Sequence, residues 1–379
     1  MNLGVAIPGI RRWTARALVA LAAMLVLVLV VGIAASDRWH ATQYVAWTPQ
    51  WGVMFALAAC VAGAGVMATG RSGRARRVAW TLAGAMVAWV LAVEWRWYRA
   101  VLPGPGRESA VRVLVWNPAW EKMSVFHERV LEARPDVFLC ANPHPNADWV
   151  KLREGFGAPT YTLRQGTLVV VSRYPIRRFA WVPLAIAPEP NRPSWWPVPK
   201  TSAGGGEALC VVLDVPGFEG GMVVWLVDLP SDSWAWRGRV MADAAAAIQG
   251  FRGPFMTRDD GGRDVPEDAL RLGQLLPHGG FEARPDAEPA RGFPAPDLLA
   301  GDLNTPAGCW SVSRLAPGLR DAFADAGLGP RGTFPRKWPL LAIDQALLGP
   351  RVKAVAYDAV DLGPAQHLAQ VIEVRHDAR

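Results

Sequence analysis

Three long stretches without a charged residue dominate the first quarter of the chain. They are residues 17–35 (19 residues), 51–70 (20 residues) and 78–93 (16 residues). About 20 apolar residues cross the hydrocarbon core of a bilayer as a helix, and helices buried in a soluble core seldom lack charge for so long. Aromatic residues that suit the headgroup region extend the third stretch: Trp95, Trp97 and Tyr98. The sequence therefore predicts a membrane domain of residues 1–100 with three transmembrane helices, at about 17–35, 51–70 and 78–98.

Basic residues indicate how these helices are oriented. Seven arginines lie before the first stretch or between the second and the third: Arg11, Arg12, Arg16, Arg71, Arg74, Arg76 and Arg77. The loop between the first two stretches has only Arg38, beside Asp37. Because positively charged loops stay in the cytoplasm, we expect a multi-pass protein of the plasma (inner) membrane with a cytoplasmic N-terminus and an extracytoplasmic C-terminal domain. A cleaved signal peptide at 17–35 remains an alternative, and it would leave the C-terminal part on the same side.

The net charge of +7 reflects this membrane topology and says little about partners. Residues 1–100 alone carry +8, and the rest of the chain carries −1. A protein that binds duplex nucleic acid needs clustered cations to displace counterions, and no Lys/Arg-rich run follows residue 100. We therefore expect the membrane, and no duplex nucleic acid, as a partner. The four cysteines form no CxxC motif, which argues against a zinc ribbon, and a disulfide from Cys309 to Cys140 or Cys210 stays open.

The rest of the sequence predicts one mixed α/β domain. Residues 101–109 form a linker rich in Pro and Gly, and the domain spans 110–379 with an irregular insertion at about 251–295 that is rich in Gly, Pro, Asp and Arg. Strands are expected at 111–116, 137–140, 167–171, 209–215, 222–227, 298–300 and 340–348. Many strands with few long helices favour mixed sheets over a doubly wound fold.

The segment Gly301-Asp302-Leu303-Asn304 directly follows one of these strands. Side chains two residues apart in extended chain project on the same side, so Asp302 and Asn304 could both reach one pocket. A strand that leads into an Asp/Asn-rich turn is an equally good explanation of this segment alone.

The order of motifs over about residues 110–375 resembles the endonuclease/exonuclease/phosphatase superfamily of metal-dependent phosphoesterases. The matching motifs are a strand that ends in Asn117, Pro135-Asp136 before a strand, Ser172-Arg173-Tyr174-Pro175-Ile176, a strand that ends in Asp228-Leu229, Gly301-Asp302-Leu303-Asn304, Asp321-Ala322, Ile343-Asp344 and Gln366-His367. The resemblance implies a four-layer α/β sandwich, in which two packed mixed β-sheets are flanked by helices. Members anchored by a few N-terminal helices also exist, and this chain looks like those.

The resemblance also implies roles for five polar residues. Asn117 would help to hold phosphate or metal, and Asp302 would take a proton from the attacking water. Asn304 would orient that water and the phosphate. Asp344 would lie near the metal and the general acid, and His367 would stabilise charge on the transferring phosphoryl group.

Three positions depart from the family pattern. Asn142 replaces a glutamate that is the principal metal ligand, Asp228 replaces a histidine, and Gln366 replaces the aspartate that would orient His367. A carboxamide offers a divalent cation only a neutral oxygen. We therefore expect Asp228, with Asp302 and Asp344, to hold Mg²⁺ or Mn²⁺, and we expect His367 to lack its anionic partner.

Several functions remain open on the sequence alone. The first is an active phosphoesterase that hydrolyses a phosphodiester or a phosphomonoester, either small or lipid-linked. The second is a pseudoenzyme that keeps the fold and binds a phosphorylated ligand or a protein. A nuclease and a purely structural membrane protein are further alternatives. The near-neutral domain favours a lipid-linked or small phosphate ester over duplex DNA.

Overall fold

The computed structural model describes residues 6–67, 73–102, 106, 108–122, 126–190, 192–195, 205–258, 283–285 and 290–377. The chain divides into two units, Met1–Pro103 with Leu328–Pro330, and Gly104–Gly327 with Arg331–Arg379.

The helical elements are α1 (Ala6–Ala34), α2 (His40–Ala46), α3 (Gln50–Met67), α4 (Gly73–Trp89), the π-helix η1 (Val90–Glu94), the 3₁₀-helix η2 (Trp97–Ala100), α5 (Phe126–Glu132), α6 (Trp149–Phe156), α7 (Arg237–Gly250), α9 (Val312–Leu315) and α10 (Ala322–Ala326). The strands are β1 (Val111–Trp116), β2 (Val137–Ala141), β3 (Tyr161–Gln165), β4 (Leu168–Ser172), β5 (Ile176–Pro183), β6 (Glu207–Leu213), β7 (Met222–Asp228), β8 (Met256–Arg258), β9 (Ala283–Pro285), β10 (Leu298–Asp302), β11 (Arg320–Asp321), β12 (Asp344–Leu348), β13 (Val352–Val360) and β14 (Ala369–His376).

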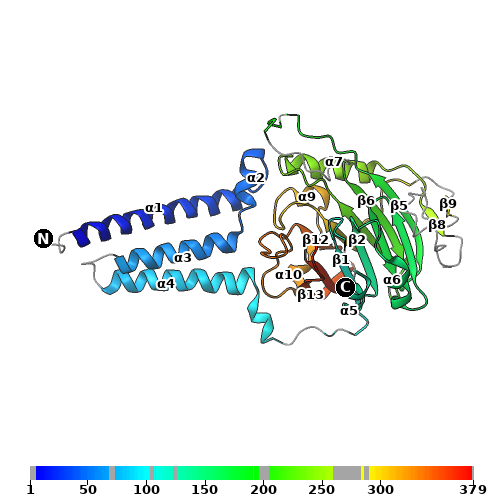
Figure 1. The fold of residues 1–379 in the computed structure, drawn as a ribbon, viewed down its shortest axis with the longest axis horizontal. Helices are drawn as coiled ribbons and strands as arrows, with labels where there is room; N and C mark the ends of the chain where they lie inside the picture. The colour runs from blue at the N-terminus through cyan, green and yellow to red at the C-terminus, as the bar shows by residue number, and fades with distance from the viewer. Residues whose placement is uncertain are drawn as a thin grey trace. The chain divides into compact units, whose positions relative to one another are not determined.

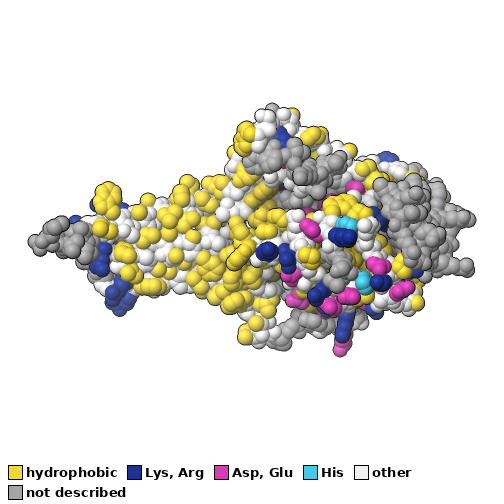
Figure 2. Space-filling model, viewed as in Figure 1, with side chains coloured by type: hydrophobic (Ala, Val, Ile, Leu, Met, Phe, Trp, Pro, Cys, Tyr) yellow, Lys and Arg dark blue, Asp and Glu magenta, His cyan; other side chains and the backbone are white. Residues whose placement is uncertain are grey.

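The N-terminal unit contains the three expected helices. Those long and apolar enough to cross a membrane are Gly9–Ala34, Gln50–Met67 and Gly73–Glu94. Helices α1, α3 and α4 lie side by side (Figure 1). In the view of Figure 2, hydrophobic side chains cover much of these helices, and Lys and Arg side chains gather at the end that carries the N-terminus. This unit fits membrane association. The short helix α2 was not predicted from the sequence.

The C-terminal unit is built on two mixed sheets, which confirms the predicted four-layer sandwich (Figure 1). Six strands form one sheet in the order β13-β14-β1-β2-β4-β3, and eight form the other in the order β11-β12-β10-β7-β6-β5-β8-β9. The neighbours β1 and β2 are parallel, as are β7 and β10, and the other pairs are antiparallel. The carboxyl ends of these two parallel pairs carry most of the predicted site residues.

Both faces of the central strands are buried. In β1, successive side chains point to opposite faces of the sheet and enter two different apolar clusters. Val113 and Val115 belong to the core between the two sheets. Leu114 and Trp116 point the other way, into a second apolar cluster under α5 and α6. A third cluster packs the opposite face of the larger sheet against α7 and α9. A strand buried on both faces has few polar residues inside it, so its ends are where polar groups collect.

Two details differ from the sequence-based expectations or settle what they left open. Part of the expected irregular insertion forms strands, because β8 pairs with β5 and β9 pairs with β8 at the edge of the larger sheet. The four cysteines are all buried and free, so no disulfide joins Cys309 to another cysteine.

Gly301 explains why the strand that precedes the site needs a glycine. Its φ is +136°, a conformation that residues with a side chain rarely adopt. A Cβ at this position would lie 2.0 Å from the carbonyl oxygen of Val227 on β7. Glycine therefore lets β10 and β7 approach closely one residue before Asp302, and it fixes where that carboxylate is placed.

We expect Gly301→Ala to destabilise the C-terminal unit by about 3 kcal/mol or more, since backbone strain and overpacking each cost about 1–3 kcal/mol. Gly220→Ala is the matched control, because Gly220 also has a positive φ, +76°, but a Cβ there meets nothing within 4 Å. The stability of both variants is measured on the full chain in detergent, as its resistance to a protease over a series of urea concentrations. Equal losses in the two variants would show that the approach to Val227 is unimportant.

Candidate active site

Four acidic residues lie side by side across the larger sheet. Residue pairing places Glu207 of β6 opposite Asp228 of β7, Asp228 opposite Asp302 of β10, and Asp302 opposite Asp344 of β12. Residues that face each other across a ladder point to the same side of the sheet. This register therefore gathers negative charge in a row across the ends of these four strands, which we call the acidic edge. The sequence predicted three of these carboxylates, from three different motifs.

The smaller sheet brings the remaining predicted residues to the same site. Asn117 directly follows β1, and Asn142 directly follows the parallel strand β2. His367 precedes β14, which is antiparallel to β1, and therefore lies at the same end of the sheet. Hydrogen bonds then connect the two sheets. Nδ2 of Asn117 donates to Oδ2 of Asp302 at 2.8 Å, and Nδ2 of Asn142 donates to Oδ2 of Asp228 at 3.1 Å.

Asp302 is almost fully buried, at 2% exposure, and is held from several directions. Besides the bond from Asn117, its Oδ1 accepts the backbone N–H of Asn304 at 2.8 Å. The side chain of Asn304 donates to the carbonyl of Leu229, the residue after Asp228, at 2.8 Å. The Gly-Asp-x-Asn segment thus makes the turn expected of Asp and Asn, and the turn itself orients the carboxylate.

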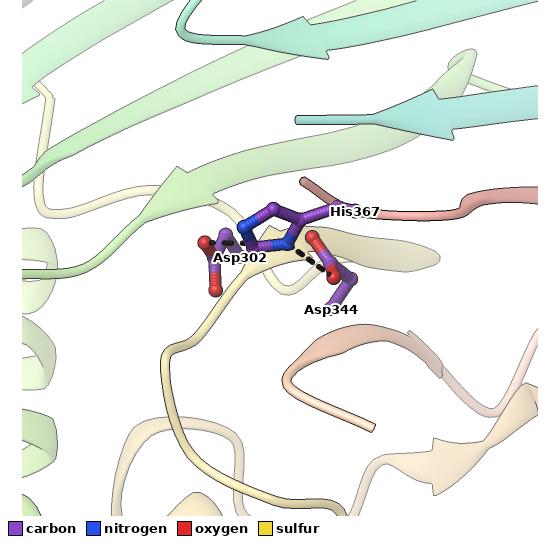
Figure 3. Close-up of side chains that lie close together, drawn as sticks. All are labelled: Asp302, Asp344 and His367. Carbon is purple, nitrogen blue, oxygen red and sulfur yellow. Dashed lines mark hydrogen bonds and ion pairs between the residues drawn. The ribbon is translucent and has the colours of Figure 1, made fainter. Parts of the chain in front are cut away.

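His367 lies between two carboxylates (Figure 3). Its Nδ1 is 2.9 Å from Oδ2 of Asp344, within hydrogen-bonding distance, and 4.0 Å from Oδ2 of Asp302. The expectation that His367 lacks an anionic partner is therefore wrong. Gln366 is exposed and its backbone carbonyl accepts the N–H of Arg336, whereas Asp344, from another strand, orients the imidazole.

Burial and charge separate the pKa values of these groups. Burial alone would lower the pKa of His367, but the charge and hydrogen bond of Asp344, together with the charges of Asp302 and Asp228, raise it to about 9. Burial and the charge of Asp344 raise the pKa of Asp302 to about 6, although His367 and hydrogen bonds oppose the shift. Burial and the charge of Asp302 raise the pKa of Asp228 well above its ordinary value. At neutral pH the site therefore holds an imidazolium beside an ionisable base.

Asp302, Asp344 and His367 form a group of possible metal ligands. Their ligand atoms lie within 4.8 Å of one another, and all three residues are buried. Burial, and then the charge of Asp344, raise the pKa of Asp302, and a bound cation would lower it. Carboxylate oxygens suit Mg²⁺ or Mn²⁺, so Asp302 and Asp344 fit such an ion. Among the described residues this group does not include Asp228, which we expected as a third ligand and which instead pairs with Asn142.

Three further residues shape the site and were missed from the sequence. Glu207 accepts the N–H of Thr167 at 3.0 Å and so links the larger sheet to the smaller one. The ring of Phe334 lies against His367, with 4.9 Å between their centroids. Arg237 of α7 is fully buried and bonds the carbonyls of Pro230 and Leu303 and the hydroxyl of Thr305, in the loops that follow β7 and β10. These contacts join segments far apart in the sequence, so only the tertiary structure reveals them.

A separate pocket lies on the α5 and α6 side of the smaller sheet. Its volume is about 210 Å³, and His127, His144, Glu121 and Asp148 are among its lining residues. None of these residues belongs to the group of possible metal ligands in the described part of the chain.

Known proteins are similar to this chain in sequence or in fold. The sequence model of the Endonuclease/Exonuclease/phosphatase family matches residues 115–365. Among solved structures, a functionally unknown conserved protein from Enterococcus faecalis V583 is similar at 14% identity and a TM-score of 0.46, covering 70% of this chain and 100% of its own. An endonuclease/exonuclease/phosphatase family protein from Bacteroides thetaiotaomicron is similar at 13% identity and a TM-score of 0.45. The match covers 71% of this chain and 96% of that protein. A mannosyl-6-phosphatase from Bacteroides thetaiotaomicron VPI-5482 has 13% identity and a TM-score of 0.43, with coverages of 70% and 99%. No curated protein matches the chain.

We expect Asp344→Asn to lower the pKa of His367 by roughly 1–3 pH units, the effect of an opposite charge at this distance. Histidine-labelled full-length protein in detergent, titrated by NMR with His367→Gln as the assignment standard, measures this directly. Because the folded pKa of about 9 exceeds the ordinary value of 6.5, the charged imidazole stabilises the fold below about pH 6.5, and this contribution is lost as the pH rises through 9.

Asp358→Asn is the control for this titration, because Asp358 is an exposed carboxylate on β13 of the smaller sheet. It should leave the pKa of His367 unchanged. An unchanged pKa in Asp344→Asn as well would show that Asp344 is not the partner of His367.

Proposed function

Because this chain belongs to the endonuclease/exonuclease/phosphatase family, whose members are phosphoesterases or nucleases, we propose that it is a membrane-anchored, metal-dependent phosphoesterase. The observation that carries the proposal is the convergence of Asp302, Asp344 and His367 at the joint edge of the two sheets. Two carboxylates and one imidazole cost free energy to remove from water, and apolar side chains would join two sheets without that cost.

Asp302 is the residue best suited to accept a proton from an attacking water. Its pKa of about 6 leaves the carboxylate ionised at neutral pH yet basic enough to act as a general base. Its two oxygens are oriented by Asn117 and by the backbone of Asn304, which leaves a lone pair on each oxygen for a water.

His367 and the two asparagines can stabilise the phosphoryl group as its charge redistributes. With a pKa of about 9, His367 is an imidazolium at neutral pH and offers Nε2–H beside the acidic edge. Asn117 and Asn304 each use one N–H of the side-chain amide within the protein, so each has a second N–H to give to a phosphate oxygen.

A divalent cation would be held by the carboxylates of Asp302 and Asp344. When bound, such an ion polarises a phosphoryl oxygen as a Lewis acid and lowers the pKa of bound water. His367 is bound to Asp344 through Nδ1, and a cation on the carboxylates would lower the pKa of its imidazole.

Charge favours a small or lipid-linked phosphate ester as the substrate. The chain after residue 100 carries −1 and has no basic run, which disfavours a nuclease that acts on duplex DNA. Either a phosphomonoester or a phosphodiester is compatible with the same base and the same imidazolium.

One observation favours a catalytically inactive relative as the second candidate. Asn142 and Asp228 bond each other across the two sheets, and no carboxylate stands at position 142. A pseudoenzyme would keep the pocket and bind a phosphorylated ligand or a protein partner without hydrolysing it.

We expect full-length protein in detergent with Mg²⁺ or Mn²⁺ to hydrolyse an aryl phosphomonoester or phosphodiester, and Asp302→Ala to reduce turnover by about 10²–10⁴-fold, the usual contribution of a general base. Chelation of the metal should have a similar effect and should reverse when the metal is returned. The substrate panel should also include duplex DNA over a range of salt concentrations.

Asp358→Ala serves as the control, since it removes an exposed carboxylate outside the site. Turnover that persists in Asp302→Ala would refute the assigned base. No turnover by the wild type and no metal binding by calorimetry would favour the pseudoenzyme, and steeply salt-sensitive DNA binding would favour a nuclease.

We also propose that the C-terminal unit lies outside the cytoplasm, on the evidence of the basic loops. Glu219→Cys, in an exposed turn of the C-terminal unit, should react with a membrane-impermeant maleimide in cells whose outer barriers alone are opened. Arg74→Cys, at the exposed start of α4, should react only after the membrane is dissolved. The four native cysteines are buried, so they give little background. The reverse labelling pattern would invert the topology.

A further inference from the structure

A short hairpin of residues 333–341 joins α10 to β12 and ends next to the active site. The amide of Phe334 donates to the carbonyl of Leu341 at 2.9 Å, and the amide of Leu341 donates back at 2.8 Å. At the tip, the amide of Trp338 donates to the carbonyl of Pro335 at 2.9 Å, which closes a tight turn. The segment is thus an ordered projection.

The base of the hairpin is fastened to the chain on both sides of His367. The amide of Leu368 donates to the carbonyl of Thr333 at 2.8 Å, and the amide of Arg336 donates to the carbonyl of Gln366 at 2.7 Å. A contact made by the tip is therefore held at a fixed distance from the catalytic imidazole.

Two side chains strengthen this attachment. The ring of Phe334 packs against the imidazole of His367, and the guanidinium of Arg336 binds both oxygens of Asp361 at 2.8 and 3.1 Å. Arg336 is consequently committed to the base of the hairpin, and its neighbour Lys337 carries the positive charge of the tip.

The tip exposes apolar surface that the C-terminal unit does not cover. Trp338 is 75% exposed and Leu340 is 44% exposed, and Lys337 between Arg336 and Trp338 is exposed as well. An exposed tryptophan beside a lysine suits the interface of a membrane, where the indole enters the headgroup layer and the ammonium meets lipid phosphates.

The covalent chain keeps the C-terminal unit close to any bilayer that the apolar helices cross. The last helical turn of the N-terminal unit ends at Ala100 and β1 begins at Val111. The ten intervening residues span at most about 35 Å even when fully extended. If the three apolar helices cross a membrane, the C-terminal unit must stay at its surface, and a lipid layer is the apolar partner present at the highest local concentration.

We propose that the hairpin 333–341 contacts the bilayer, with Trp338 and Lys337 in the headgroup layer, and that the active site takes a phosphate ester carried by a lipid. The substrate class rests on the proposed function, whereas the lipid contact does not. Because the base of the hairpin is tied to both neighbours of His367, a tip seated in lipid presents the acidic edge of the sheets to headgroups at the same surface.

The lipid contact can be measured without turnover. Full-length protein with Trp338→Cys, carrying an environment-sensitive dye, is reconstituted into vesicles of phosphatidylethanolamine and phosphatidylglycerol that contain a headgroup-region nitroxide lipid. The native cysteines are buried, so the introduced thiol takes the dye. The control is Glu219→Cys, in the exposed turn that precedes β7 and so lies at the opposite end of the strand from Asp228.

We expect nitroxide lipid to quench the dye at position 338 at least threefold more strongly than at position 219, and aqueous iodide to show the opposite order. Lys337→Glu in the same labelled chain should weaken the quenching at 338 at least twofold. Equal quenching at the two positions would overturn the lipid contact. Strong quenching without any hydrolysis would contradict the proposed function and leave the contact intact.

The substrate class is tested with Trp338→Ser. This variant should lower hydrolysis of phosphatidic acid or phosphatidylglycerol in vesicles at least fivefold and change kcat for a soluble aryl phosphate less than twofold. Trp338 lies outside the polar residues of the site, so its loss should not affect the chemistry itself. An equal loss on both substrates, or no loss on either, would overturn the assignment of a lipid-borne ester.

Discussion

The pairing of β10 with β7 on one side and β12 on the other determines the character of this protein. The register places Asp228, Asp302 and Asp344 next to one another, and Gly301 permits the close approach of the strands that brings them together. Buried like charges repel, so the fold must either protonate them or supply positive charge. Burial and the neighbouring carboxylates raise the pKa of Asp302 and of Asp228, and the imidazolium of His367 supplies positive charge.

His367 links this acidic edge to the smaller sheet. Its Nδ1 binds Asp344, while its backbone carbonyl accepts the indole N–H of Trp116, at the end of β1. Asn117 makes the second connection, from the end of β1 to Asp302. The site is therefore a joint between two sheets as well as a pocket, and its polar contacts contribute to the positions of the sheets relative to each other. A group that serves both purposes cannot be altered without some effect on packing.

Two of the three departures from the family pattern, Asn142 and Asp228, lie together on one side of the site. Asn142 and Asp228 bond each other, and the raised pKa of Asp228 indicates a carboxyl that tends to stay neutral. On the other side, the carboxylates of Asp302 and Asp344 lie beside the imidazole of His367.

The sequence by itself determined the elements and the chemistry at their ends. Uncharged length marks a membrane helix, and alternation marks a strand, because both are local consequences of burial. Hence the bounds predicted for β1 and β2 lie within one residue of the observed bounds, and Asp302 was identified from its own motif. Only the tertiary structure determined which side chains contact each other. The family pattern suggested position 366 as the partner of His367, but residues 363–367 run through a series of bends that leaves Gln366 exposed and His367 buried. Gln366 therefore faces solvent, and Asp344, 23 residues away along the chain, reaches the imidazole because sheet register, which depends on contacts distant in sequence, brings it there.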